Sequence, residues 1–223
     1  MEQAKVTLQV VHDAEEVLAK AQQAAQQAAD QLSLAKLTLR EQSGGDAVIE
    51  RGGVRCMLKD LDDVLLKDIG GKIKQDGRWP LIVDPSGQAA TFLRYRDTNY
   101  LDAMHSDNMK PDTLRLALLG AIRYGKALVI NMMDVDLLES VENQLNQVSP
   151  GLSSQLMSKE LLKEERYLNL VRSSDGPQYD RTEFRPDRLE MFSLVMLTKQ
   201  RHPSDVLLTT FYPIEVTLQE QKI

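Results

Sequence analysis

A strand, a single-glycine turn and a helix are predicted in succession between Arg78 and Ala89, where the sequence reads RWPLIVDPSGQA. This is the layout of a phosphate-binding loop, in which glycines let backbone N–H groups surround phosphates, a lysine contacts the β and γ oxygens, and a hydroxyl binds magnesium. No lysine follows Gly87, and the pattern GK[ST] occurs nowhere in the chain. The segment therefore predicts the architecture of such a loop without its nucleotide chemistry.

Three aspartates near predicted helix starts are further candidates for chemistry. Asp84 precedes Pro85 at the strand-to-helix turn, and Asp134 and Asp136 precede a second predicted helix. A carboxylate in such a place accepts hydrogen bonds from free backbone N–H groups and faces the positive end of the helix dipole. We interpret all three as capping residues, and we expect any residual phosphate binding at residues 86–89, where a helix begins.

Histidines and the one cysteine are too scattered to form a reactive site. His12, His105 and His202 lie far apart, and no HExxH spacing occurs, so a zinc site is not predicted. Cys56 falls in a predicted amphipathic helix without a neighbouring histidine, and no GxSxG elbow is present, which favours a buried side chain over a nucleophile. We therefore predict no catalytic, cofactor-binding or metal-binding residue, and no cofactor.

Composition narrows the classes of partner. A net charge of -6 over 223 residues argues against a nucleic-acid binder, which needs a concentrated basic face. The basic groups near the loop, Arg94, Arg96 and Lys126, and the pair Lys199 and Arg201, are interpreted as solvated surface charges. A single cysteine forms no intrachain disulfide, and no apolar run approaches the ~20 residues of a membrane span. We expect a cytoplasmic chain with neither nucleic-acid nor membrane partners.

An apolar seam runs through residues 11–39 and predicts a long helix over residues 1–42. Its positions repeat at alternating steps of three and four, and one of its two heptad sets is all alanine, which allows a partner helix to approach closely. Such a seam requires a second copy or another protein, and the alternative is a helix that lies on its own globular domain. The seam consists of Val11, Ala14, Leu18, Ala21, Ala25, Ala28, Leu32, Ala35 and Leu39.

Glycines divide the rest of the chain. Ser43–Gly45 and Arg51–Gly53 predict a flexible linker, and apolar residues at helical spacing over 54–69 predict a short amphipathic helix. The expected divisions are 1–42, 43–75 and 76–223.

Apolar runs that alternate with helical patterns over residues 76–223 predict βαβ units. The run at 127–130 is apolar throughout, as expected for a strand buried on both faces of a parallel sheet. We predict an α/β three-layer sandwich with a mostly parallel sheet. The predicted strands are 81–84, 100–104, 127–130, 191–197 and 211–218, the helices 89–96, 111–124 and 134–148, and a hairpin joins 166–171 to 179–184.

The opening RWPL segment, with its DP-x-GQA turn, resembles the start of the fifth AAA-type module of dynein heavy chains. Gly125–Asn131 is similar to the family's strand where active relatives carry Walker-B acids, but here Asn131 ends the strand. Arg166–Asp180 resembles the family's hairpin insertion, and Leu194–Pro203 its sensor strand. The residues that match the sensor pattern are Thr198, Lys199, Arg201 and Pro203.

The resemblance implies a degenerate P-loop fold that binds no nucleotide and serves as a structural module. It further implies a dynein or axonemal assembly and a cytoskeletal or ciliary location. The family's stalk, microtubule-binding head and helical lid are not found in this sequence, so motor activity is not carried over. Two alternatives stay open: an ATP-binding AAA-type subunit that needs a partner, and a truncated, inactive dynein-related product. The module could also belong to a larger scaffold protein with IQ motifs and ankyrin repeats.

Overall fold

The computed structural model describes residues 2–41 and 52–217, and the chain divides into two compact units, Met1–Gly44 and Gly45–Ile223. Most of the predicted linker, residues 43–51, lies outside the described residues, whereas Gly52 and Gly53 at its end are described. None of the helices within the two described ranges is both long and apolar enough to cross a membrane.

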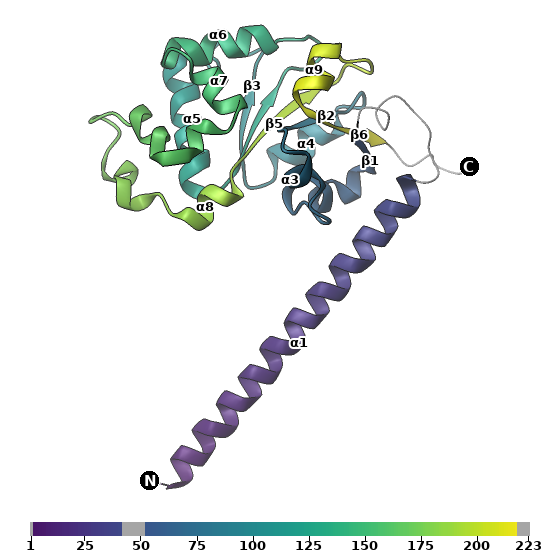
Figure 1. The fold of residues 1–223 in the computed structure, drawn as a ribbon, viewed down its shortest axis with the longest axis vertical. Helices are drawn as coiled ribbons and strands as arrows, with labels where there is room; N and C mark the ends of the chain where they lie inside the picture. Colours follow the sequence, from purple (N-terminus) through teal and green to yellow (C-terminus); the bar gives the residue numbers. More distant parts are fainter. Residues whose placement is uncertain (1, 42–51, 218–223) are drawn as a thin grey trace. The chain divides into compact units, whose positions relative to one another are not determined.

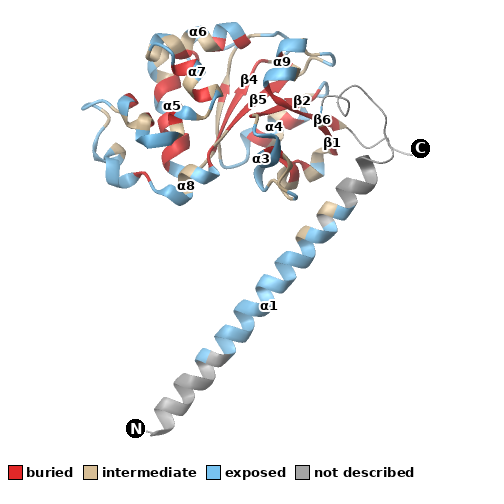
Figure 2. Cartoon of the chain, viewed as in Figure 1, coloured by how far each residue is buried: buried red, intermediate tan, exposed pale blue. Residues whose placement is uncertain are grey.

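Helix α1 (Glu2–Glu41) forms the first unit. Its alanines, glutamines and leucines have high helix propensity, and it contains neither glycine nor proline. Lys20 bonds to Glu16 and Gln26 to Asp30, both at 2.8 Å and four residues apart, which adds local support. The side chains between Ala14 and Ala29 are all exposed, as the pale-blue stretch in Figure 2 shows.

The second unit is built on one six-stranded sheet, which confirms the predicted α/β class. All its strands are parallel, and their order across the sheet is β1-β6-β2-β5-β4-β3. The strands are β1 (Val54–Met57), β2 (Pro80–Val83), β3 (Thr98–Asp102), β4 (Ala127–Asn131), β5 (Ser193–Thr198) and β6 (Tyr212–Thr217).

Helical segments connect these strands and cover both faces of the sheet (Figure 1). Because crossovers between parallel strands are right-handed, the connections before β3 lie on one face and the later ones on the other. On the first face are η1 (Leu58–Asp60), η2 (Asp62–Leu66), α3 (Lys72–Asp76) and α4 (Gln88–Arg94). On the second are α5 (Pro111–Tyr124), α6 (Leu138–Val148), α7 (Leu152–Met157), η3 (Glu160–Leu170), η4 (Pro177–Tyr179), η5 (Arg181–Glu183), α8 (Pro186–Met191) and α9 (Asp205–Thr210).

Alternate residues of the central strands enter the two layers of core. Leu81, Leu128 and Met196 belong to the large hydrophobic cluster that includes Leu118 of α5. The intervening residues are buried on the opposite face, and β4 is buried at all five positions (Figure 2). The prediction of a strand covered on both faces is therefore confirmed for β4. The intervening residues are Ile82, Val129, Val195 and Leu197.

The predicted helix over residues 54–69 is wrong in its first part. Residues 54–57 form β1, which pairs with β6, and Val54 and Cys56 are both buried. Short 3-10 and π-helical turns follow, and α3 begins only at Lys72. Apolar residues four apart look helical, but pairing with a strand 160 residues later decides the conformation of this segment.

The predicted hairpin at 166–184 is also wrong, because 3-10 turns occupy both of its expected strands. Tyr167 and Phe184 meet with ring centroids 4.9 Å apart, and both rings are buried. Asp175 in the intervening turn forms a buried ion pair with Arg115 of α5 at 2.6 Å. This segment is thus held by its contacts with α5 and the core rather than by strand pairing.

Candidate functional site at the carboxyl edge of the sheet

The loop after β2, the end of β4 and the end of β5 meet at one edge of the sheet. Strand β5 lies between β2 and the strand β4, and all three run in the same direction. Their carboxyl ends therefore share one edge, which is where open α/β sheets bind ligands. Three of the four segments that resemble the dynein module are thus neighbours in the fold.

Asp84 is fully buried, and its carboxylate holds the turn after β2 through hydrogen bonds. Its Oδ1 accepts hydrogen bonds from the Ser86 N–H at 3.0 Å and the Ser86 hydroxyl at 2.5 Å. Its Oδ2 accepts the Ala89 N–H at 2.6 Å. The predicted capping role of Asp84 is confirmed, because its carboxylate binds the Ala89 N–H in the first turn of α4.

The remaining donors of the turn are occupied as well. The Gly87 N–H donates to the Asp84 carbonyl at 3.1 Å, and the Gln88 N–H donates to the Ser86 hydroxyl at 3.2 Å. Gly87 has φ of 74°, a left-handed conformation that glycine adopts without steric cost. A loop that wraps phosphate presents its N–H groups outward to the ligand, whereas these four N–H groups are bound by the loop's own oxygens.

Lys199, at the end of β5, lies directly over the turn. A Cβ added at Gly87 would lie 2.9 Å from Lys199 Cε and 3.4 Å from its Nζ. The Lys199 N–H donates to the Met133 carbonyl at 2.8 Å, which fixes the backbone of the lysine beside the loop. The sequence predicts a solvated charge at Lys199. Its position over the loop follows from the adjacency of β2 and β5, which no local pattern encodes.

The end of β4 carries amides and sulfur in place of acids. Asn131 is buried, its Oδ1 accepts the Met133 N–H at 3.0 Å, and its Nδ2 lies 2.8 Å from the Met133 sulfur. Thr198 of β5 donates its hydroxyl to the Met133 carbonyl at 3.2 Å. Burial raises the pKa of Tyr100 on neighbouring β3, so its phenol stays neutral. Asn131, Met133 and Thr198 are thus bonded to one another, and these groups supply no carboxylate for magnesium.

Asp136 is confirmed as a capping residue, since its Oδ1 accepts the Leu138 N–H at 3.2 Å at the start of α6. It also accepts the Ser204 hydroxyl at 2.6 Å, which links α6 to α9. Asp134 differs, because the Gln200 side-chain amide donates to its backbone carbonyl at 3.1 Å. That contact gives no support to a capping role for the Asp134 carboxylate.

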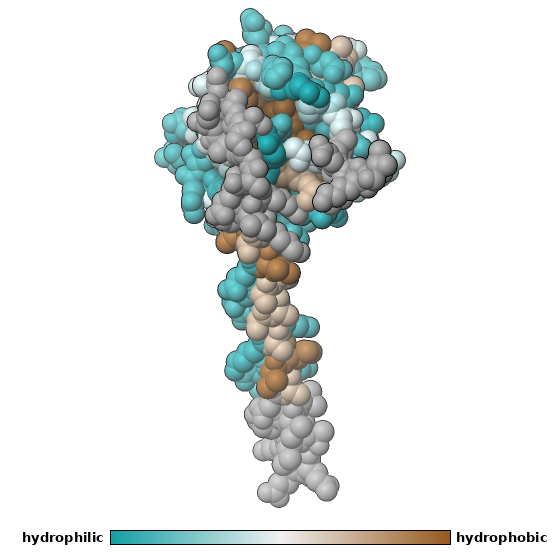
Figure 3. Space-filling model, turned by 90° about the vertical axis from the view of Figure 1, so that its right-hand side faces the viewer, coloured by the Kyte–Doolittle hydropathy of each residue, from teal (hydrophilic) through white to brown (hydrophobic). Residues whose placement is uncertain are grey.

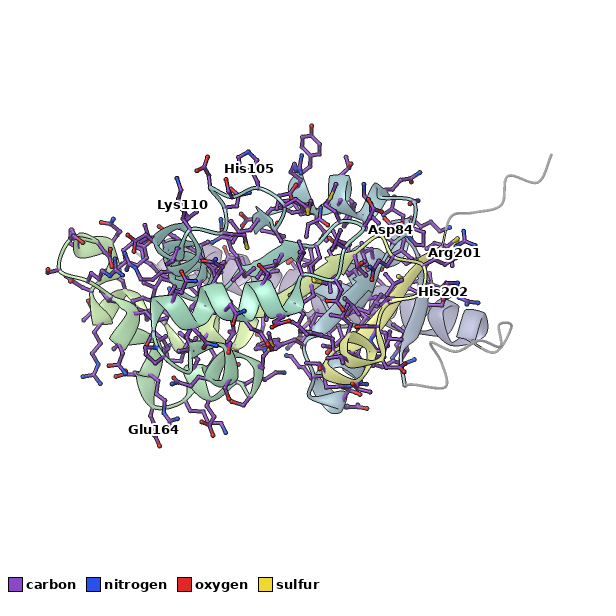
Figure 4. All side chains as sticks on the ribbon, turned by 90° about the horizontal axis from the view of Figure 1, so that it is seen from above. Asp84, His105, Lys110, Glu164, Arg201 and His202 are labelled. Carbon is purple, nitrogen blue, oxygen red and sulfur yellow. The ribbon has the colours of Figure 1, made fainter. Side chains whose placement is uncertain are left out.

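Other predicted candidates are dispersed. Figure 4 shows His105 well apart from His202, and within the described residues no cluster of potential metal ligands occurs. Of the basic groups expected near the loop, Arg94 lies 4.8 Å from the Tyr100 ring centroid. Lys126 instead precedes β4 at the opposite edge of the sheet, where it pairs with Asp97 at 2.5 Å.

Comparison with known proteins identifies no family for this chain. No protein-family model matches the chain, and no solved structure matches it.

Proposed function

We propose that this chain is a non-catalytic, dynein-like AAA module that acts as a structural or interaction scaffold. The observation that carries the proposal is the Asp84 carboxylate bound to the N–H groups that a phosphate would need. The adjacency of the three strands that resemble the dynein module supports a degenerate P-loop architecture. The buried Asn131 at the expected Walker-B position supports the absence of hydrolysis.

Electrostatics makes phosphate binding at this turn unfavourable. An incoming phosphate would meet a carboxylate of like charge, and two unit charges 4 Å apart repel by about 4 kcal/mol at an effective dielectric constant near 20. Displacing Asp84 would also break its hydrogen bonds to Ser86 and Ala89. Lys199 offsets part of this repulsion, but its ammonium cannot release the occupied N–H groups.

Calorimetric titration with magnesium-ATP and magnesium-ADP tests the proposal, and we expect no heat of binding. Inorganic phosphate serves as the matched probe for the turn alone, and it should also give no heat. A dissociation constant for ATP below roughly 100 μM, or about -5.5 kcal/mol, would overturn the scaffold assignment.

Lys199 favours one alternative, an ATP-binding subunit that acquires its remaining groups from a partner. In that case the lysine that the loop lacks comes from the neighbouring strand, since its Nζ lies against Gly87. Lys199→Met removes the charge and keeps the stem. If ATP binds the parent chain and the variant loses that binding, the ATP-binding function replaces the scaffold function.

We further propose that α1 couples the module to a protein partner or to a second copy. Its seam is exposed along the described side chains, with Leu18 and Leu32 each 58% exposed. Figure 3 shows brown and tan residues along this face of the helix, flanked by teal. The alanines between the leucines allow close approach of a second helix. A dynein or axonemal assembly, and a cytoskeletal or ciliary site within the cytoplasm, follow from the resemblance alone.

The role of α1 is tested by light scattering of the purified chain after size exclusion. Ala21→Glu with Ala28→Glu places two charges in the seam and should convert oligomers to monomers. Gln23→Glu with Gln27→Glu adds the same charges on another face and should leave the oligomers intact. A parent chain that is monomeric at high concentration, with unchanged stability in the seam variant, would refute self-association.

A further inference from the structure

A cavity of about 700 Å³ opens at the amino edge of the sheet, opposite the loop that contains Asp84. The starts of β4 and β5 and the residue before β2 form its floor, and α3 and α8 contribute to its walls. Its size lies within the roughly 300–1,000 Å³ range of small-molecule sites. The loop and the Asn131 strand end contribute nothing to it, so it is independent of the function proposed above.

Trp79 provides a rigid apolar wall of this cavity. Its indole N–H donates to the Leu156 carbonyl at 2.8 Å, and its ring meets Phe192 edge-on with centroids 5.7 Å apart. Leu65, Leu162 and Phe192 also line the cavity. The hydrogen bond to Leu156 and the ring contact with Phe192 fix the orientation of the indole, so this wall of the cavity is preorganised.

Lys159 brings an ammonium group to the same wall. Its Nζ lies 4.1 Å from the centroid of the Trp79 ring, and its backbone has φ of 63°, a left-handed conformation that is unfavourable for a side-chain-bearing residue. Burial lowers the pKa of Lys159, with Asp76 opposing this effect. In residues 52–217 no ion pair of Lys159 is found, and Asp76 is itself paired with Arg78 at 2.7 Å.

Most other charged groups that line the cavity have partners or are exposed. Lys67 pairs with Asp63 at 2.7 Å, Lys126 with Asp97 at 2.5 Å, and Asp187 with Arg185 at 3.1 Å. Asp68 accepts hydrogen bonds from the N–H groups at the start of α3. Lys74 and Glu190 are exposed to solvent and have opposite signs. Lys159 is half-buried, so its ammonium is the lining cation that combines partial burial with the lack of an ion pair in the described part of the chain.

We propose that this cavity binds a small organic anion with an apolar body, of the class of a medium-chain carboxylate. The anionic group lies at Lys159, and the apolar body lies on Trp79 and the leucines beside it. A bound anion would compensate the ammonium for the hydration that partial burial takes from it. Glu190 would favour a cation instead, so the test compares both signs.

Trp79 is the chain's only tryptophan, so its fluorescence reports on this cavity alone. We would titrate the full chain with octanoate, 1-octanol, acetate and octyltrimethylammonium and follow the emission. Octanoate should bind at least tenfold more tightly than octanol, and acetate should leave the emission unchanged. Equal affinity for octanoate and octanol, or tighter binding of the ammonium compound, would overturn the proposal.

Lys159→Met keeps the apolar stem on the indole and removes the charge. It should weaken octanoate at least tenfold and leave octanol unchanged, with an unaltered circular-dichroism spectrum. Lys163→Met is the matched control, because Lys163 is exposed, lies four residues away and does not line the cavity. Equal octanoate affinity in the two variants would show that Lys159 does not hold the anion.

Discussion

Replacing Asp84 with alanine tests whether the turn after β2 depends on its own carboxylate. The substitution removes the acceptors for the Ser86 hydroxyl, the Ser86 N–H and the Ala89 N–H. Ser86 is exposed, so water takes over both of its donors. Ala89 is fully buried, so its N–H is left without an acceptor.

The expected loss of stability in Asp84→Ala follows from these three hydrogen bonds. The Ala89 N–H is both the buried donor and the bond that caps α4, so its loss is counted once, at about 1–3 kcal/mol. We therefore expect the free energy of unfolding to fall by about 1–3 kcal/mol. At about 2–4 °C per kcal/mol for a unit of this size, the melting temperature should fall by about 2–12 °C.

Denaturant titration and thermal melts measure the loss, and Asp102→Ala provides the control. Asp102 is the last residue of β3, and its carboxylate accepts the Met104 N–H at 3.0 Å, but Met104 is 60% exposed. The control should lose less than about 1 kcal/mol, because water reaches the freed donor. If Asp84→Ala costs no more than Asp102→Ala, the carboxylate does not hold the turn, and the argument against phosphate binding fails.

Three further outcomes test the fold and the loop. Arg115 holds the pKa of Asp175 below its ordinary value, so the pair's stabilisation is complete above about pH 4 and disappears as pH falls through the folded pKa. Denaturant midpoints from pH 6 to 2.5 should fall more steeply for the parent than for Asp175→Asn. Gly125→Ala should lower the free energy of unfolding in denaturant by at least about 2 kcal/mol. Gly125 has φ of 69°, and a Cβ there would lie 2.9 Å from the Arg188 carbonyl oxygen. A smaller loss would show that α8 shifts freely. Gln88→Lys should leave the melting temperature within about 2 °C and produce no phosphate release from ATP; hydrolysis would reveal intact catalytic machinery.

Local signals explain what the sequence predicts correctly in the second unit. Pro111 and Gly125 delimit α5 because proline suits a first helical residue and glycine a left-handed end. The apolar run at 127–130 becomes a central strand because nothing polar interrupts it. Asp84 is predictable as a cap because its acceptors and donors lie within five residues of each other.

Non-local contacts explain what the sequence leaves undetermined. β1 depends on a partner 160 residues away, and its residues four apart imitate a helix. Residues 160–184 depend on the Arg115–Asp175 pair and on buried aromatic rings rather than on strand propensity. The position of Lys199 over Gly87 depends on strand order, which brings together residues more than 100 positions apart.

The place of β6 in the sheet has a consequence for synthesis of the chain. β6 is the last strand, yet it lies between β1 and β2, and Ile214 pairs with both Val54 and Ile82. A ribosome therefore releases β1 long before its neighbour exists, and β1 has no other strand beside it. The sheet can close only after nearly all of the polypeptide has emerged. Folding should consequently be late and slow, and chains interrupted before residue 212 should leave the apolar edges of β1 and β2 open to aggregation.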